Sequence, residues 1–322
     1  MGFKRETQIF STSINTVTIG TGDKQITLGG ENVLPLYSFD APGGSLKENR
    51  PMVGVAVSDM GYPKNIPGYE VFYAGADSTA EQAKRAANMP GADFLVLCLD
   101  SAHPNNGDKP VDDCIKLVVE VANAVDTPLV IEGSKHIDKD IILLEEVAKA
   151  LQGKNVLILS AHEGNYKTVA TAAALAYGQN IAAESAVDIN LAKQLNVLIN
   201  VLGVKPDKVV MNLGSAAGGY GFEYIASTIE RVKLAALAQN DEMLKMPIIT
   251  PVSSETWAVK ESIASEEDYP EWGSLEERGV NMEIATAAAC LAAGSNAVIL
   301  SHPDSVKTIA ELIDDLIKGG AQ

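Results

Sequence analysis

Eight short apolar segments, each closed by polar residues or glycine, alternate with helical segments along this chain of 322 residues. Their starts are about 24 to 49 residues apart, which is the spacing of a strand–helix unit. The expected strands are Val53–Val57, Phe94–Leu99, Leu129–Ile131, Val156–Leu159, Asn180–Ala183, Val209–Met211, Ile248–Thr250 and Ala297–Leu300. The expected helices are Ala80–Asn88, Val111–Val125, Lys139–Leu151, Tyr166–Ala176, Asp188–Leu202, Glu223–Ala238, Asn281–Ala293 and Ser305–Ile317.

Eight consecutive units without a long linker favour a closed (β/α)8 barrel, the TIM barrel, over an open doubly wound sheet. An open Rossmann-type sheet needs a glycine-rich fingerprint directly after its first strand. Here the first strand runs into Ser58-Asp59-Met60-Gly61-Tyr62, which lacks that fingerprint. We therefore predict a single α/β domain over residues 1–322, with a hairpin and lead-in over 1–50 and the eight units over 51–322.

The segment before the barrel has the period-two alternation of β-strands, first over Gln8–Ile19 and then over Gln25–Leu28. Between these two runs, Gly20-Thr21-Gly22-Asp23 is typical of a hairpin turn. We expect an N-terminal β-hairpin that plugs the floor of the barrel and carries no chemistry.

The chain has 42 acidic and 25 basic residues, a formal charge of −17. Such a surface repels phosphate backbones and anionic lipid, so neither nucleic acid nor membrane is an expected partner. An acidic face for a basic partner and ordinary solubility charge both remain open interpretations. The longest uncharged stretches are interrupted by Gly, Asn, Gln or Ser, which argues against a membrane span.

The three cysteines, Cys98, Cys114 and Cys290, lie far apart and form no CxxC pair. They offer no disulfide framework and no zinc or iron–sulfur spacing, so we expect small buried side chains. The first residues are polar and contain no signal-peptide core. Both features predict a cytoplasmic protein.

Function in this fold resides in the loops that follow the strands. The polar residues there are Ser58, Asp59, Asp100, Ser101, His103, Glu132, Ser134, His162, Glu163, Asn165, Glu184, Ser185, Asp188, Asn212, Ser215, Thr250, Ser253, Ser254, Ser301 and His302. All four histidines lie on this rim or just beyond it. The first strand lacks paired histidines, however, and no two histidines are four residues apart on a helix, so we expect no bound metal.

Three further chemistries are disfavoured. Glu132, Glu163 and Glu184 end consecutive strands, as the magnesium-binding carboxylates of enolases do, but no lysine within a strand is available as a base. The same absence argues against Schiff-base chemistry. The turns after the last two strands contain no glycine, which disfavours a phosphorylated substrate.

A glycine-rich loop follows the sixth strand and reads Asn212-Leu213-Gly214-Ser215-Ala216-Ala217-Gly218-Gly219-Tyr220-Gly221. Small residues let a backbone approach a flat or bulky ligand closely. A flexible turn before the next helix would explain the same composition.

Several strand-end segments, taken together, resemble one family. They are Asp188–Asn200, Gly218–Tyr224 with Glu230-Arg231, Asn165-Tyr166-Lys167, Thr256-Trp257, Tyr269–Gly273 and Ser301-His302-Pro303. The chain resembles the small (delta) subunit of the corrinoid iron–sulfur protein of the carbon monoxide dehydrogenase/acetyl-CoA synthase system. The likeness extends from the hairpin to the last helix and keeps the order of all eight units.

The resemblance implies a methyl carrier of the reductive acetyl-CoA (Wood–Ljungdahl) pathway of carbon fixation in anaerobes. In this family a large subunit holds an iron–sulfur cluster and most of the contacts to the cobamide, and the small barrel covers the corrin as the second half of a heterodimer. Methyl groups arrive from methyltetrahydrofolate through a methyltransferase and leave to acetyl-CoA synthase. The implied partners are thus the large subunit, the methyltransferase and the synthase.

This resemblance makes the chain a binding subunit with no turnover of its own, and no catalytic residue is expected. The residues expected to approach the corrin are Asn190, Asn212, Gly214, Ser215, Gly218, Gly219 and Tyr220. The chain itself lacks a DxHxxG cobalamin motif, because Asp100-Ser101-Ala102-His103-Pro104 has the wrong spacing. Cobamide and cluster are therefore expected on the partner.

The family is also similar to pterin-binding methyltransferase barrels, which hold methyltetrahydrofolate with Asp and Asn side chains. Asp59, Asp100, Asp188, Asn190 and Asn212 offer such a set here. The turn Ser185-Ala186-Val187-Asp188 departs from the Asp-Pro-Leu type usual in those enzymes. A pterin-dependent methyltransferase is accordingly the alternative function.

Overall fold

The computed structural model describes residues 8–34 and 50–318. Its strands are β1 (Val17–Ile19), β2 (Ile26–Leu28), β3 (Met52–Ser58), β4 (Phe94–Cys98), β5 (Leu129–Glu132), β6 (Leu157–Ala161), β7 (Asn180–Glu184), β8 (Val209–Asn212), β9 (Ile248–Pro251) and β10 (Ala297–Leu300). Its helices are α2 (Pro67–Tyr73), α3 (Thr79–Ala86), α4 (Val111–Ala124), α5 (Ile137–Ala150), α6 (Tyr166–Ala170), α7 (Ile189–Val201), α8 (Phe222–Ala238), α9 (Val252–Thr256), α10 (Lys260–Ile263), α11 (Leu275–Ala293) and α12 (Pro303–Ile317).

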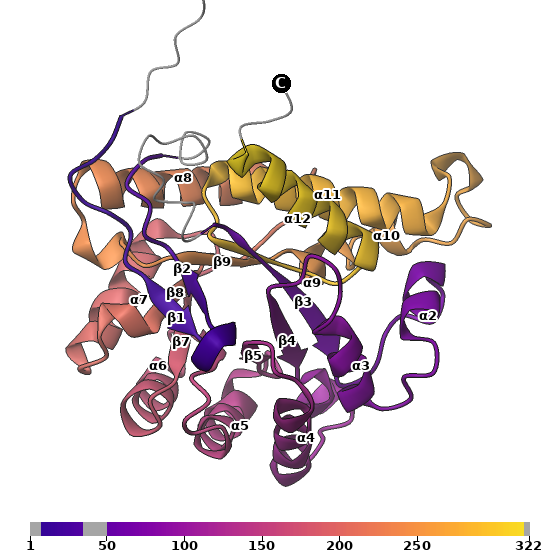
Figure 1. Ribbon diagram of the computed structural model, residues 1–322, viewed down its shortest axis with the longest axis horizontal. Coiled ribbons are helices and arrows are strands. Elements are labelled where there is room, and N and C mark those ends of the chain that lie inside the picture. Colours follow the sequence, from indigo (N-terminus) through magenta and orange to yellow (C-terminus); the bar gives the residue numbers. More distant parts are fainter. Residues whose placement is uncertain (1–7, 35–49, 319–322) are drawn as a thin grey trace, which may run out of the picture.

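Strands β3 to β10 form a closed parallel barrel, in which β10 pairs with both β3 and β9. Helices lie around the outside of this barrel (Figure 1). The predicted TIM barrel is therefore confirmed, and each of the eight expected strands is present within two residues of its predicted bounds.

Period-two alternation divides each barrel strand between two cores. Along β3, Val53, Val55 and Val57 face the layer between strands and helices, while Met52 belongs to the core inside the barrel. Gly54 sits opposite the ring of Phe94, because a Cβ on Gly54 would lie 2.2 Å from Phe94 Cε2. The large inward ring of β4 thus requires glycine on its neighbour.

The hairpin of β1 and β2 is antiparallel, and its buried side chains complete the core inside the barrel. Val17, Ile19 and Leu28 pack there with the inward residues of the strands. Asn180, at the amino end of β7, donates a hydrogen bond of 3.0 Å from Nδ2 to the Thr18 carbonyl. The expectation that this hairpin plugs the barrel floor is confirmed, whereas parts of the predicted lead-in (1–7 and 35–49) lie outside the described residues.

A buried charged group fastens the N-terminal segment to the barrel. The Lys233 ammonium on α8 contacts the Glu31 carboxylate and donates a hydrogen bond of 2.7 Å to Asn296 Oδ1. Lys233, Glu31 and Asn296 are 1%, 5% and 5% exposed. Lysine and glutamate are almost never buried to this extent without a partner, so each depends on the other.

Helices in the rim differ from expectation more than strands do. Neither α2 nor α10 is predicted from the sequence, and residues expected to form a plain turn after β9 form α9. The expected helix Tyr166–Ala176 is α helical only to Ala170 and continues as a π-helix over Thr171–Ala176.

None of the described helices has the length and apolar character needed to cross a membrane.

Candidate functional site

Two adjoining cavities occupy the barrel mouth, at the carboxyl ends of the strands. The first, of about 290 Å³, lies on the side of β3, β4 and β10, and the second, of about 210 Å³, lies on the side of β6, β7 and β8. Both are lined by Glu132 at the end of β5 and Lys135 just after it, and by Pro251 at the end of β9 and Ser254 in α9. Because β5 and β9 are opposite each other in the strand order, these residues form a bar across the mouth.

The first cavity has largely apolar and aromatic walls. Tyr62, Tyr69 and Tyr73 come from α2 and the loop before it, and Trp257 follows α9. The rings of Tyr69 and Trp257 lie 5.8 Å apart, and the Tyr69 hydroxyl is 2.6 Å from Ser301 Oγ. Burial raises the pKa of Tyr69 well above its usual range, so its hydroxyl keeps its proton. This wall is preorganised by packing.

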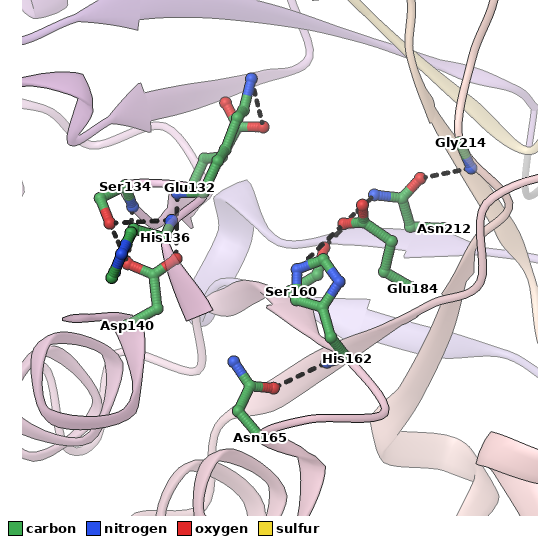
Figure 2. A network of polar contacts seen from close by, with 11 residues as sticks. Glu132, Ser134, His136, Asp140, Ser160, His162, Asn165, Glu184, Asn212 and Gly214 are labelled. Atoms are coloured by element: carbon green, nitrogen blue, oxygen red, sulfur yellow. Dashed lines mark hydrogen bonds and ion pairs between the residues drawn. The ribbon is translucent and has the colours of Figure 1, made fainter. Parts of the chain in front are cut away.

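The bar across the mouth depends on a tightly held turn after β5. Lys135 Nζ lies 3.3 Å from Glu132 Oε1, although Lys135 has a left-handed backbone with φ of 66°. Asp140 holds this turn by accepting hydrogen bonds from the Ser134 and Lys135 amides, at 2.7 and 3.0 Å (Figure 2). A Cβ on Gly133 would lie 2.7 Å from the Asp140 carboxylate. The turn therefore holds the Lys135 side chain next to Glu132.

Glu132 is more enclosed than its partner in this bar, since its side chain is 12% exposed against 51% for Lys135. Burial raises the pKa of Glu132, and the Lys135 ammonium opposes that rise. The neighbouring Cys98 thiol also has its pKa raised, first by burial and then by the charge of Glu132. Cys98 is consequently an inert thiol at neutral pH.

The second cavity is organised by Asn212 (Figure 2). Its Nδ2 donates to Glu184 Oε2 at 2.9 Å and lies 3.3 Å from Ser160 Oγ, and its Oδ1 accepts the Gly214 amide at 3.0 Å. His162 Nε2 lies 3.7 Å from the same Glu184 oxygen. Asn212 is 2% exposed, so it positions Glu184 and the start of the glycine-rich loop.

The structure brings only part of the predicted corrin-contacting set together. Asn212, Gly214 and Ser215 line the second cavity, and Ser215 Oγ is buried without a hydrogen-bond partner among the described residues. The other four residues lie on the rim outside this cavity. Asn190 is exposed at the start of α7, and Gly219 is also exposed. The Gly218 amide donates to Thr286 Oγ1 at 3.1 Å, and the Tyr220 hydroxyl donates to Glu261 at 2.5 Å. The predicted residues thus surround one half of the mouth.

Comparison with known proteins places the chain in a family. A family model described as "CO dehydrogenase/acetyl-CoA synthase delta subunit" matches residues 16–293. The chain belongs to this delta subunit family. The resemblance found in the sequence is therefore confirmed.

Curated members of the delta subunit family are similar over most of the chain. The acetyl-CoA decarbonylase/synthase complex subunit delta 2 of Methanosarcina acetivorans is 34% identical over 306 residues, which cover 92% of this chain and 67% of that protein. The subunit delta of Methanocaldococcus jannaschii is 32% identical over 300 residues, covering 91% of this chain and 70% of that protein. The chain thus spans about two thirds of the length of these relatives.

Solved structures show the same fold with little sequence similarity. A dihydropteroate synthase from Xanthomonas albilineans, solved with 4-aminobenzoic acid, aligns with a TM-score of 0.55 at 14% identity, covering 95% of this chain and 100% of that one. The enzyme from Stenotrophomonas maltophilia aligns with a TM-score of 0.53 at 17% identity, covering 85% and 95%. At these identities the match establishes the barrel alone.

Three of the four rim histidines of this delta-family chain cap helices. His103, His136 and His302 each accept a backbone amide at Nδ1, from Asn105 at 3.0 Å, Lys139 at 3.3 Å and Asp304 at 3.2 Å. A ring nitrogen that accepts a hydrogen bond carries no proton. Within residues 8–34 and 50–318, no three His, Cys, Asp or Glu side chains are grouped so that they could hold a metal ion.

Replacing His136 by alanine should destabilise the protein by about 0.5–2 kcal/mol, because α5 would lose its N-terminal cap. His136→Asn should restore most of that loss, since asparagine is a favoured capping residue. Urea unfolding followed by circular dichroism measures both. Equal losses in the two variants would contradict the capping role.

Sequence reasoning missed the helix α2 and the side chains that it contributes to the first cavity. One available signal was Pro67, which occupies the first turn of α2 as proline often does. The position of Lys135 in the mouth was also missed, because its neighbours in the sequence do not predict a left-handed backbone at this non-glycine residue. All three cysteines are buried as expected, and burial raises the pKa of Cys290 to about 12.

Proposed function

We propose that this chain is the small subunit of a corrinoid methyl carrier in a CO dehydrogenase/acetyl-CoA synthase complex. In this proposal its mouth covers the corrin of a cobamide held mainly by a large subunit, which also carries the iron–sulfur cluster. The methyl group comes from methyltetrahydrofolate through a methyltransferase and passes to acetyl-CoA synthase. Family membership, and relatives named as delta subunits of acetyl-CoA decarbonylase/synthase complexes, support this role.

The observation that carries the proposal is a set of exposed apolar side chains around the barrel mouth. Five large apolar side chains that follow strand ends are more than half exposed: Met60 at 58%, Val71 at 78%, Tyr220 at 51%, Tyr224 at 66% and Ile263 at 53%. Two of their helices, α2 and α10, stand at the right-hand edge of Figure 1. We call these five residues the apolar rim. Such exposure around one opening is typical of a protein-binding face.

The dimensions of the mouth suit a lid over a large cofactor. Cavities of about 290 and 210 Å³ are at or below the lower end of the range for sites that enclose drug-sized molecules. A corrin, which is larger, fits only if it lies across the rim. The unpartnered Ser215 hydroxyl in the second cavity suits a carboxamide side chain at the corrin edge.

When bound, the cobamide supplies the nucleophilic metal that accepts the methyl group. The contribution of this chain would be to exclude water and to position the corrin. Ser215, Gly219 and Tyr220 are the residues proposed to contact it, with Asn212 holding their loop. No proton transfer by this chain is required in this proposal, because the cobalt itself is the nucleophile and the proton needed by the leaving pterin nitrogen would be supplied where the folate is bound, on the methyltransferase.

The first test is coexpression with the large subunit. We expect the two chains to copurify as a complex with the visible spectrum of a corrinoid and an iron–sulfur cluster. Met60→Asp combined with Tyr224→Asp should lower the yield of that complex at least about tenfold, because charges would enter the interface core. Val201→Asp is the matched control, since Val201 on α7 is 77% exposed but lies away from the mouth.

The alternative, a pterin-dependent methyltransferase, gives different results in the same preparation. Purified alone, it would bind methyltetrahydrofolate and methylate free cob(I)alamin. A covering subunit would do neither. Tight folate binding by a colourless chain that captures no large subunit would overturn the proposed role.

A further inference from the structure

The mouth carries an excess of acidic side chains over basic ones. Among the residues that line its two cavities are five carboxylates, those of Asp100, Glu132, Asp140, Glu184 and Glu255, against one ammonium, that of Lys135. His162 is the remaining titratable base. Neither the apolar rim nor the proposed covering role explains this excess.

Most of this charge has no cation to neutralise it. Among the described residues, no lysine or arginine lies within 4 Å of the carboxylates of Asp100, Glu184 or Glu255, and Glu184 has only His162, at 3.7 Å. Neutral donors hold them instead: Ser58 Oγ donates to Asp100 at 2.5 Å, and Asn212 Nδ2 donates to Glu184 at 2.9 Å. Such hydrogen bonds fix a carboxylate in place and bring no opposite charge to it.

The position of these carboxylates at the barrel mouth reduces the screening of their charge by solvent. The Glu132 and Glu184 side chains are 12% and 28% exposed, at the ends of β5 and β7. Charges in a partly enclosed cleft with low-dielectric walls are screened less than surface charges and act together on whatever covers the cleft. A partner seated on the apolar rim would exclude further water and strengthen the effect.

We infer that the acidic mouth discriminates between charge states of the group lying over it and stabilises the more positive one. This inference rests on the proposed function, which places a corrin there. When Co(I) takes up a methyl group, cobalt supplies both electrons of the new bond, the donor keeps the electrons of the broken bond, and the charge of the complex rises by one. When Co(II) is reduced by one electron, its charge falls by one.

Asp100 and Glu184 therefore favour the methylated state and disfavour Co(I). Lys135 acts in the opposite sense, because its ammonium offsets Glu132 in the same bar. The inference thus predicts effects of opposite sign from neighbouring residues. A purely structural role would not produce this pattern.

The test is a spectroelectrochemical titration of the Co(II)/Co(I) couple in the complex of both subunits, with the electrode supplying the electron through mediators. The double variant Asp100→Asn with Glu184→Gln keeps the hydrogen-bond acceptors and removes two charges. At a fixed potential it should raise the ratio of Co(I) to Co(II) about tenfold, a shift of about 59 mV for one electron. Lys135→Gln should lower that ratio.

Controls separate charge at the mouth from charge in general. Glu311→Gln changes the net charge by one in the same direction as each acidic substitution, and Lys307→Met changes it by one in the same direction as Lys135→Gln. Both are at exposed positions of α12 and should leave the ratio unchanged. Glu255→Gln, an exposed rim position, should raise the ratio even if a buried variant fails to fold. Equal ratios in all variants, or equal shifts in the controls, would overturn the inference. Failure to obtain a coloured complex at all would instead overturn the proposed function.

Discussion

Replacing Lys233 by methionine is expected to lower the free energy of unfolding by about 3–5 kcal/mol, the usual effect of removing one partner from a buried ion pair. Glu31 would stay in a site where it is 5% exposed, and Asn296, at 2.9 Å, would be the one side chain of residues 8–34 and 50–318 left to donate to it. Lys233 also donates to Asn296, whose Oδ1 accepts the Ile248 amide. The substitution thus disturbs α8, the N-terminal segment and the start of β9 together. Chemical unfolding measures the change.

The double variant Lys233→Met with Glu31→Gln separates charge from packing. It removes both charges, and pairs replaced by neutral groups of similar volume often cost little. We expect it to regain at least half of the loss. Lys193→Met, which breaks an ion pair of 2.6 Å with Asp241 at an exposed site, should cost less than about 1 kcal/mol. A double variant as unstable as the single one would contradict the charge argument.

Replacing Glu283 by alanine should destabilise the protein by about 2–4 kcal/mol, because two backbone donors would lose their acceptor inside the protein. Glu283 on α11 is fully buried and accepts the Ser301 amide at 2.8 Å and the His302 amide at 3.3 Å. These amides lie where β10 leads into α12, beside the first cavity. Thermal and urea unfolding check the size of the loss.

Glu283→Gln should behave differently, because it keeps an acceptor oxygen and removes the charge. Burial raises the pKa of Glu283 in the folded protein, so ionising it costs stability. This cost is absent below the pKa of the unfolded chain, about 4.3. It grows with rising pH until the raised folded pKa is passed. The variant should therefore gain stability relative to the parent between pH 4 and neutrality, and a constant difference across that range would refute the assignment.

The fold was predictable because it depends on a repeated pattern. Val53, Val55 and Val57 against Met52 and Ala56 show the alternation of a strand covered on both faces, and the same signal returns in every unit. The hairpin was predictable for the same reason, from Val17, Ile19 and Leu28. Because the pattern recurs in eight units, a wrong assignment in one unit does not change the predicted fold.

The site was less predictable, because it depends on contacts between distant residues. The role of Asp140 as the clamp of the Lys135 turn requires knowing where α5 begins and how the turn folds back on it. The aromatic wall joins Tyr69 and Trp257, which are far apart in the sequence. The glycine-rich loop was visible as composition, but only the structure shows that Asn212 anchors its start from a buried position.

The hairpin that seals the barrel floor makes the molecule a cup with one opening. A molecule held at the mouth has one way in and the same way out, because the inward residues of the strands fill the barrel and Val17, Ile19 and Leu28 of the hairpin close its other end. If the proposed function holds, a protein that delivers a methyl group to this opening and a protein that collects it would have to bind in turn, because both would use the same opening. The rate of such an assembly would then depend on how fast one partner dissociates and the next one binds.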